Sequence, residues 1–221
     1  MPKPRIDTSR RADLRLVCGG TGSGKSSYIK KEIRRLKPSR ILIWDPVDEY
    51  GELADVRITS PLELSALLKR YPHGALKVRF VAEGAKMFEF WAACAFAWCN
   101  ACLVAEELAD VTTAGKAPPH WGHVVRRGRA RGLAPIFAVT QRPSESDKTT
   151  VGNATLTHVG RFNRQQDRKY MADEMDIDVR EIAALAPLEF IEKDAYANTV
   201  IKGKLGARKT TQIGTKSQIY T

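Results

Sequence analysis

Short apolar runs alternate with amphipathic segments along most of the chain. The runs LRLVC and ILIW are apolar almost without interruption, a pattern typical of strands that are buried on both faces of a parallel sheet. ALKVRFV instead alternates between apolar and polar positions, as a strand with one wetter face does. On these patterns, strands are predicted over residues 14–18, 41–44, 75–81, 101–105, 136–140 and 155–162.

The segments between these runs carry helix signals. Ile29, Ile33 and Leu36 fall on one helical face, and Pro38 marks that helix's end. Ser60-Pro61-Leu62-Glu63 has the cap residue, first-turn proline and glutamate of a capping box. Helices are predicted over residues 26–36, from 60 to about 71, and over 88–98, 120–131, 164–175 and 179–185.

Strand and helix therefore alternate, which predicts an α/β fold with a mostly parallel central sheet and helices on both faces. Residues 188–204 have the pattern of a C-terminal hairpin, and residues 203–221 are polar and basic with little periodicity. We expect one domain over residues 1–202, followed by a basic, flexible tail over residues 203–221.

The charge balance favours a polyanionic partner. Thirty-six Lys and Arg residues against 25 Asp and Glu give a formal net charge of +11. Nucleic acid is the first candidate and an anionic membrane surface the second, while a charge that only opposes aggregation is the alternative. The N-terminal residues MPKPRIDTSRRADLR lack the apolar core of a signal peptide, and the longest apolar run, residues 90–105, is too short to cross a membrane.

The four cysteines leave two interpretations. Cys99 and Cys102 form a C-x-x-C pair upstream of His120 and His123, so a zinc site has to be considered. The His-x-x-His spacing is shorter than the usual three to five intervening residues, which favours reduced, structural cysteines.

The segment GGTGSGKS, residues 19–26, fits the phosphate-binding pattern G-x-x-x-x-G-K-[ST] between a predicted strand and a predicted helix. Glycines allow successive backbone N–H groups to curl around a phosphate, and the helix N-terminus adds a favourable dipole. Lys25 is expected to reach the β- and γ-phosphates of ATP, and Ser26 to hold Mg²⁺. A chance match is the alternative. The predicted nucleotide-binding residues are Gly20, Thr21, Gly22, Ser23, Gly24, Lys25, Ser26 and Ser27.

Two further strands end in polar groups suited to hydrolysis. CLVAEEL ends in Glu106, a candidate for organising Mg²⁺, and Glu107, a candidate base for the attacking water. A solvated pair of glutamates at a strand end is the alternative interpretation. IFAVTQRPS ends in Thr140 and Gln141, whose neutral amide can sense the γ-phosphate. That arrangement places a strand between the phosphate-loop strand and the acidic strand, which a small-molecule kinase does not need.

Together these motifs resemble the FtsK/HerA superfamily of DNA-pumping ATPases. The resemblance is carried by GRARGLAPIFAVTQRPS, by the strand that follows Asn153, by Asp167, and by WDPVDEYG, which is similar to the D-P-x-x-E-Y stretch of HerA-type members. It spans residues 14–200 and implies a RecA-like (ASCE) P-loop NTPase fold. Glu106 stands where the family usually has Asp, and the longer glutamate carboxylate can still reach the Mg²⁺ shell.

The short chain resembles, within this superfamily, the genome-packaging ATPases of tailless icosahedral dsDNA viruses with an internal membrane. The resemblance implies a homo-oligomeric ring, a hexamer or a pentamer, that moves double-stranded DNA without reading its sequence. It also implies contacts with a capsid vertex or membrane proteins, and a location at the packaging vertex of the virion or in the host cytoplasm. The alternatives are a cellular or plasmid DNA-transfer or repair motor, a P-loop small-molecule kinase, and a nucleotide-switch assembly protein.

Ring ATPases of this kind complete each active site with an arginine from the next subunit. The candidates are Arg126, Arg127, Arg129 and Arg131, of which Arg129 best matches the family's arginine, with Arg161 as a second possibility. A solvated or DNA-facing arginine cluster is the alternative. Charge for the DNA backbone is expected from Arg10, Arg11, Lys202, Lys204, Arg208, Lys209 and Lys216. A disordered basic tail that docks on a capsid or a membrane is an equal alternative for the tail residues.

Overall fold

The computed structural model describes residues 9–207 and 210–215, and within these residues the strands form one ten-stranded sheet in the order β10-β9-β8-β7-β1-β6-β5-β2-β4-β3. Strands β7 to β3 in this order run parallel, whereas β8, β9 and β10 are antiparallel to their neighbours. The strands are β1 (Leu14–Cys18), β2 (Arg40–Trp44), β3 (Val56–Ile58), β4 (Leu76–Phe80), β5 (Cys102–Ala105), β6 (Ile136–Thr140), β7 (Leu156–Gly160), β8 (Glu189–Asp194), β9 (Thr199–Lys204) and β10 (Thr210–Ile213).

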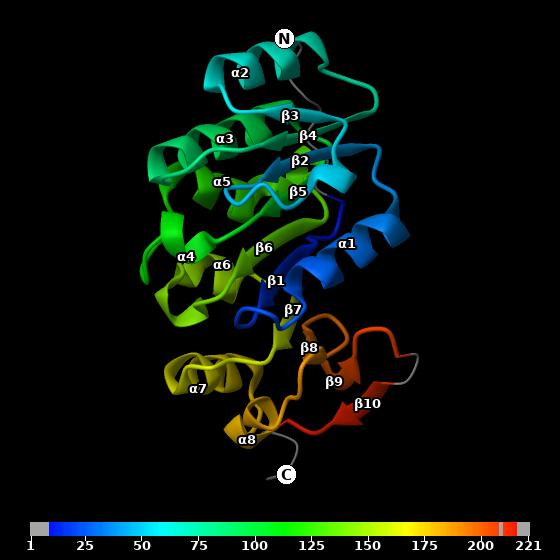
Figure 1. The fold of residues 1–221 in the computed structure, drawn as a ribbon, viewed down its shortest axis with the longest axis vertical. Coiled ribbons are helices and arrows are strands. Elements are labelled where there is room, and N and C mark those ends of the chain that lie inside the picture. Colours follow the sequence, from blue (N-terminus) through cyan, green and yellow to red (C-terminus); the bar gives the residue numbers. More distant parts are fainter. Residues whose placement is uncertain (1–8, 208–209, 216–221) are drawn as a thin grey trace.

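Helices lie between these strands and on both sides of the sheet (Figure 1). β3 and α2 lie at one end of the molecule, and β8 to β10 lie with α7 and α8 at the other. The helices are α1 (Lys25–Leu36), α2 (Pro61–Arg70), α3 (Ala85–Trp98), α4 (Leu108–Val111), α5 (Pro119–Arg127), α6 (Lys148–Gly152), α7 (Gln165–Met175) and α8 (Val179–Ala183). Short 3₁₀ turns are η1 (Gly51–Leu53), η2 (Gly128–Arg131) and η3 (Pro143–Glu145).

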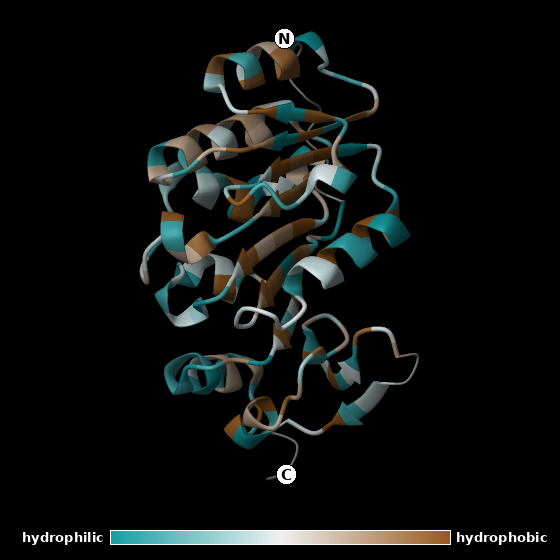
Figure 2. Cartoon of the chain, viewed as in Figure 1, coloured by the Kyte–Doolittle hydropathy of each residue, from teal (hydrophilic) through white to brown (hydrophobic). Residues whose placement is uncertain are grey.

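The sheet separates two apolar clusters, as expected for helices on both faces. Tyr28, Ile29 and Ile33 of α1 pack with Val17 of β1 in the smaller cluster. The larger cluster lies on the other face, where α3 and α5 bring together a group of aromatic rings that also contacts β2. Figure 2 shows the central strands as mostly hydrophobic. The rings of this aromatic group belong to Trp44, Phe88, Trp91 and Trp121.

The predicted α/β class, its parallel strands and the C-terminal hairpin are confirmed. Strand β6 lies between β1 and β5, as the glutamine strand was expected to do. The prediction of a single helix over residues 120–131 was wrong at its C-terminal end. The helix α5 ends at Arg127, and the chain continues as the 3₁₀ turn η2. Ser60 caps α2 as predicted, accepting a hydrogen bond from the backbone N–H of Glu63.

The segment expected to be a flexible tail is part of the sheet where it is described. β9 runs to Lys204, and β10 pairs with it, so secondary structure continues beyond residue 202. The absence of periodicity was misleading there because a four-residue edge strand is too short to show a pattern. The division into a domain over residues 1–202 and a tail over 203–221 stays a prediction, and residues 216–221 lie outside the described part.

Over residues 9–207 and 210–215, no helix combines the length and the apolar composition needed to cross a bilayer.

All four cysteines are unpaired in the structure, and burial raises the pKa of the Cys94 thiol to about 11. Nowhere in the described ranges do three or more His, Cys, Asp or Glu side chains converge in a metal-binding arrangement, so Cys99, Cys102, His120 and His123 do not form one.

Candidate active site

Four neighbouring parallel strands end at the same edge of the sheet and place the predicted chemistry there. The phosphate loop follows β1, Gln141 follows β6, the two glutamates follow β5, and Asp45 follows β2. Register keeps these ends together, because Cys18 pairs with Thr140 and Trp44 pairs with Ala105. Ligands of open α/β sheets bind at this carboxyl edge, so the fold itself selects the location of the site.

The phosphate loop has a backbone that requires glycine at two positions. Gly19 has φ 153°, and a Cβ there would lie 2.5 Å from the Ser23 hydroxyl. Gly24 has φ 98° and occupies the cap position of α1, which has no side-chain cap. The first N–H groups of α1 are therefore left for a ligand, which is the arrangement that binds phosphate at a helix N-terminus.

Lys25 lies folded over this loop. Its Nζ donates to the carbonyl oxygens of Gly19 at 2.9 Å and Gly20 at 3.3 Å. The ammonium group is thereby held at the mouth of the loop, where a β- or γ-phosphate would replace those carbonyls as its partner. The Ser23 side chain, by contrast, is buried without a hydrogen-bond partner, and the Ser23 backbone N–H donates to the Gly20 carbonyl at 3.1 Å, so Ser23 shapes the loop.

Three side chains connect the phosphate loop to the acidic strand. The Thr21 hydroxyl donates to Gln141 Oε1 at 2.8 Å, and Gln141 Nε2 donates in turn to Glu107 Oε1. These residues come from three segments separated by 120 and 34 positions in the sequence. The predicted sensor Gln141 thus touches both the phosphate loop and the predicted base.

Glu107 has a left-handed backbone, with φ 49° and ψ 50°, directly after β5. For a residue other than glycine this conformation costs on the order of 1 kcal/mol or more, and such residues cluster at functional sites. The turn aims the Glu107 side chain away from the end of the strand toward Gln141, whereas Glu106 remains 4% exposed beneath it. The two adjacent glutamates therefore have different environments and can perform different tasks.

Glu106 is held by a tyrosine that the sequence did not single out. The Tyr50 hydroxyl donates to Glu106 Oε1, and both side chains are buried. Burial raises the pKa of Glu106 from 4.5 to about 7, with a further rise from the charge of Glu107, while the Tyr50 hydrogen bond and Lys25 lower it. The acidic residue that replaces the family's usual aspartate is therefore close to half-protonated at neutral pH.

This pKa predicts how stability depends on pH. Since the folded state holds the Glu106 proton up to about pH 7 and the unfolded state only to about 4.5, the proton stabilises the fold fully below pH 4.5. That contribution is lost as the pH rises through 7. Between pH 5 and pH 8, we expect the free energy of unfolding of the wild type to fall relative to Glu106→Gln by about 2–3 kcal/mol.

Urea unfolding of both proteins at the two pH values measures this difference. Glu83→Gln, which removes an exposed carboxyl nearby, is expected to keep the wild-type dependence. A difference between wild type and Glu106→Gln that does not change with pH would show that Glu106 is already ionised in the folded protein at pH 5.

The oxygen-rich corner beside Ser26 fits Mg²⁺. The Ser26 hydroxyl donates to Glu49 Oε2 at 3.0 Å, and both Glu49 and Lys25 act electrostatically on Glu106. Hydroxyl and carboxylate oxygens are the ligands that Mg²⁺ prefers, and it commonly takes only one or two from protein while keeping waters and substrate phosphates. Tyr50, the residue after Glu49, connects this corner to Glu106, the second predicted metal residue.

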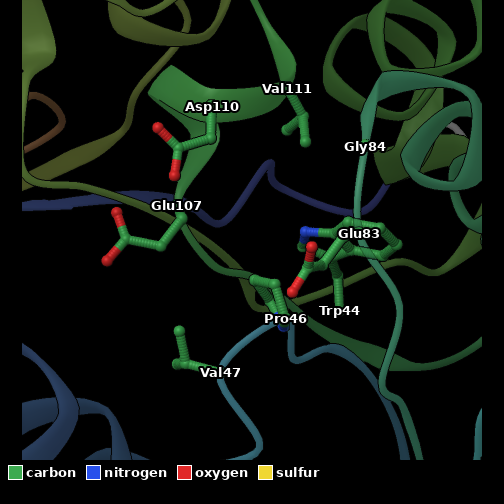
Figure 3. A pocket seen from close by; sticks show the side chains of 8 residues that line it. All are labelled: Trp44, Pro46, Val47, Glu83, Gly84, Glu107, Asp110 and Val111. Carbon is green, nitrogen blue, oxygen red and sulfur yellow. The ribbon is translucent and has the colours of Figure 1, made fainter.

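Glu107 also borders a cavity of about 330 Å³ at the ends of β2 and β5 (Figure 3). No residue of the phosphate loop lines it, so the cavity lies beside the nucleotide site and not within it. Asp110, on its rim, pairs with Arg142. The lining residues are Trp44, Pro46, Val47, Glu83, Gly84, Glu107, Asp110 and Val111.

The candidate arginines lie in two places. Arg129 is exposed in η2, before β6 begins, and therefore at the edge of the sheet opposite the phosphate loop of its own chain. Arg131 donates to the Phe96 carbonyl at 3.1 and 3.0 Å, which gives it a structural partner. Arg161 is exposed after β7, and its carbonyl accepts from Gly20 N at 2.8 Å, so it borders the loop in the same chain.

The basic residues expected to contact DNA are dispersed. Lys202 lies 3.8 Å from Glu181, and Lys204 is exposed at the end of β9. Arg10 donates to Asn100 at 3.3 Å, and the Arg11 guanidinium lies 5.5 Å from the Tyr196 ring centroid. Arg208, Lys209 and Lys216 lie outside the described residues.

Sequence reasoning missed the roles of Thr21 as a partner of Gln141, of Tyr50 and of Glu49. The WDPVDEYG segment was the signal for the last two, because it carries an acidic and an aromatic residue directly after a buried strand. Asp167, expected from the family pattern, is 1% exposed and accepts from the Ser144 hydroxyl at 2.7 Å, so it secures the loop after β6.

No protein-family profile matches the chain. It is 38% identical over 175 residues to Protein P9 of Pseudoalteromonas phage PM2, a match that covers 77% of this chain and 78% of that protein. Its structure is similar to the genome packaging NTPase B204 of Sulfolobus turreted icosahedral virus 2 in complex with AMPPCP. That similarity has a TM-score of 0.69 and 17% identity, and covers 87% of this chain and 97% of the other. The bacterial conjugative coupling protein TrwBΔN70 has a TM-score of 0.58 at 12% identity, covering 95% of this chain and 86% of its own.

Proposed function

The chain belongs to the family of Protein P9 of Pseudoalteromonas phage PM2. On that premise we propose that it is a P-loop ATPase of the FtsK/HerA superfamily that hydrolyses ATP to move double-stranded DNA, specifically to package a viral genome into a preformed capsid. The observation that carries the proposal is the hydrogen-bonded chain from Thr21 through Gln141 to Glu107. It joins the phosphate loop to the acidic strand through the inserted strand β6. A phosphotransferase acting on a small molecule has no need of such a connection.

The residues have separate tasks in this proposal. Backbone N–H groups of residues 21, 22 and 24–27 and the Lys25 ammonium bind the phosphates, and Ser26 and Glu106 would hold Mg²⁺. The N–H groups of Gly20 and Ser23, also predicted to bind nucleotide, already donate to the carbonyls of Arg161 and Gly20. Mg²⁺, when bound, neutralises charge on the β- and γ-phosphate oxygens. Glu107 accepts the proton of the attacking water, and Gln141 senses the γ-phosphate and passes its loss to the rest of the fold. Thr21 ties Gln141 to the phosphate loop.

The proposal includes an oligomeric ring of five or six copies, each completing the site of its neighbour with Arg129. DNA passes through the ring by contacts with its phosphates only, since a motor that moves a genome has to pass every sequence. A packaging motor would work at the packaging vertex of the virion or in the host cytoplasm, in contact with capsid-vertex or membrane proteins. The net charge of +11 supports the DNA partner.

Steady-state ATP hydrolysis with and without long double-stranded DNA tests the proposal. We expect DNA of any base composition to raise kcat several-fold at low salt, and the stimulation to decline steeply as salt rises, because phosphate contacts release counterions. Two duplexes of unlike sequence serve as matched substrates. Brisk hydrolysis that is indifferent to DNA at every salt concentration would contradict a DNA motor and favour a small-molecule phosphotransferase.

A further inference from the structure

We propose that Glu49, in the loop after β2, is a further Mg²⁺-facing carboxylate of the nucleotide site, acting beside Ser26 and Glu106. The inference rests on the proposed function, since it concerns the metal of the same ATP site. Its first support is direct: Glu49 Oε2 accepts the hydrogen bond of the Ser26 hydroxyl at 3.0 Å. That hydroxyl is the group which the phosphate-loop pattern assigns to the metal. Glu49 therefore occupies the place at which a cation bound to Ser26 would meet its next oxygen.

The loop that carries Glu49 is held in place by Asp45 at the end of β2. Asp45 is fully buried at the end of β2, and its two carboxylate oxygens accept the backbone N–H groups of Glu49 at 2.9 Å and Tyr50 at 3.1 Å. Arg79 of β4 balances the Asp45 charge at 3.3 Å. A buried, fully bonded carboxylate of this kind fixes the backbone at residues 49 and 50, so the two side chains start from set positions.

From these positions the two side chains reach different members of the site. The Tyr50 hydroxyl reaches Glu106 on β5, and Glu49 reaches Ser26 at the start of α1. One loop thus contacts both of the residues predicted to hold Mg²⁺. Its two contacting residues, Glu49 and Tyr50, are adjacent in the segment D-P-V-D-E-Y.

The surroundings of Glu106 also leave room for a second carboxylate. Glu106 is buried and one of its oxygens accepts the Tyr50 hydroxyl, which leaves its other oxygen for a cation. Glu49 is exposed, and its only side-chain hydrogen bond in the described part of the chain is that with Ser26. An exposed carboxylate loses little solvation on meeting a hydrated cation, and Mg²⁺ retains several of its waters in such sites.

Mn²⁺ binding, measured by electron paramagnetic resonance, tests this role without relying on turnover. The complex of the full chain with AMPPCP is titrated with Mn²⁺, and the signal of the free ion gives the affinity. We expect Glu49→Gln, which keeps the size of the side chain and an acceptor for Ser26, to weaken Mn²⁺ binding by about 10-fold or more.

Glu52→Gln is the matched control. It removes a carboxylate three residues further along the same segment, where Glu52 pairs with Lys30 at 3.0 Å and Arg34 at 2.5 Å on α1. We expect its Mn²⁺ affinity to stay within about twofold of the wild type, because the Glu52 carboxylate is directed to Lys30 and Arg34 and its charge is balanced there. AMPPCP binding in EDTA, measured for each variant, verifies that the phosphate loop is intact.

Equal Mn²⁺ affinity of Glu49→Gln and the wild type would overturn the inference. An equal loss of Mn²⁺ affinity in Glu49→Gln and Glu52→Gln would also overturn it, since that loss would reflect only the change in net charge of the protein. A wild type that binds no AMPPCP would instead contradict the proposed function itself. The two failures are therefore distinguishable in one set of titrations.

Discussion

The Glu107→Gln variant is expected to bind ATP with near wild-type affinity and to hydrolyse it with a kcat about 10²–10⁴-fold lower. The range is the typical contribution of a positioned general base. Glutamine keeps the shape of the side chain and can still meet Gln141, but it cannot accept the proton of the attacking water. The measurements are steady-state phosphate release and equilibrium binding of a fluorescent ATP analogue.

Glu107 carries this expectation because of its conformation and contacts. Its left-handed backbone turns the carboxylate out of β5, and the hydrogen bond from Gln141 fixes it beside the phosphate loop. Glu106, one residue earlier, is buried and engaged by Tyr50, so it is poorly placed to meet a water molecule. The two adjacent glutamates are therefore suited to different proposed tasks, Glu106 on the metal side and Glu107 as the proton acceptor.

Glu83→Gln provides the control for charge, because Glu83 lines the same cavity as Glu107 without belonging to the hydrogen-bonded chain. We expect it to keep wild-type kcat within about threefold, as removal of one solvent-exposed charge has little effect. If Glu107→Gln turns over ATP at the wild-type rate, Glu107 is not the base. If both variants lose activity equally, the effect is one of general electrostatics and not of proton transfer.

The parts of the fold that could be predicted from the sequence are those with long, regular patterns. β1, β2 and β6 lie inside the sheet with every residue buried, and their apolar runs, interrupted only by Arg15, Arg40 and Thr140, predict this. β3 has three residues and α4 has four, lengths at which neither a period of two nor one of 3.6 can be recognised. Those elements depend on tertiary contacts for their existence.

The residues of the site likewise differ in how far they could be predicted from the sequence. The phosphate loop and the polar residues at the ends of β5 and β6 could be predicted because each motif consists of consecutive residues in the sequence. The bond from Thr21 to Gln141 and that from Tyr50 to Glu106 join residues 120 and 56 positions apart, and no local pattern reports which residues will meet. What the sequence did supply was the DPVDEY segment, whose polar residues after a buried strand had no role until the fold brought Tyr50 and Glu49 to the site.

The Arg129→Ala variant is expected to lose about 10³–10⁵-fold in kcat while still binding ATP, the effect typical of an arginine that neutralises charge on the γ-phosphate. Arg129 lies at the opposite edge of the sheet from its own phosphate loop, so it can act only on the site of a neighbouring copy. It is exposed, and its side chain has no hydrogen-bond or ion-pair partner within residues 9–207 and 210–215, which leaves it available to a partner subunit.

Mixing two inactive variants separates action in trans from a local defect. Lys25→Ala subunits cannot bind phosphate properly but retain Arg129, whereas Arg129→Ala subunits retain the phosphate loop. In a ring formed from equal amounts of both, about one interface in four joins an intact loop to an intact arginine, given head-to-tail contacts and random assembly. We therefore expect the mixture to regain a substantial fraction of wild-type activity, although each variant alone has almost none.

Arg127→Ala is the matched control, because Arg127 is an exposed arginine two positions away at the end of α5. It is expected to keep wild-type turnover alone and to need no complementation. Failure of Arg129→Ala to recover in the mixture would contradict action in trans. Normal turnover of Arg129→Ala, together with a loss in Arg161→Ala that Lys25→Ala subunits restore, would transfer the role to Arg161. Since Arg161 borders the phosphate loop of its own chain, that result would also require a ring in which the end of β7 faces two nucleotide sites at once.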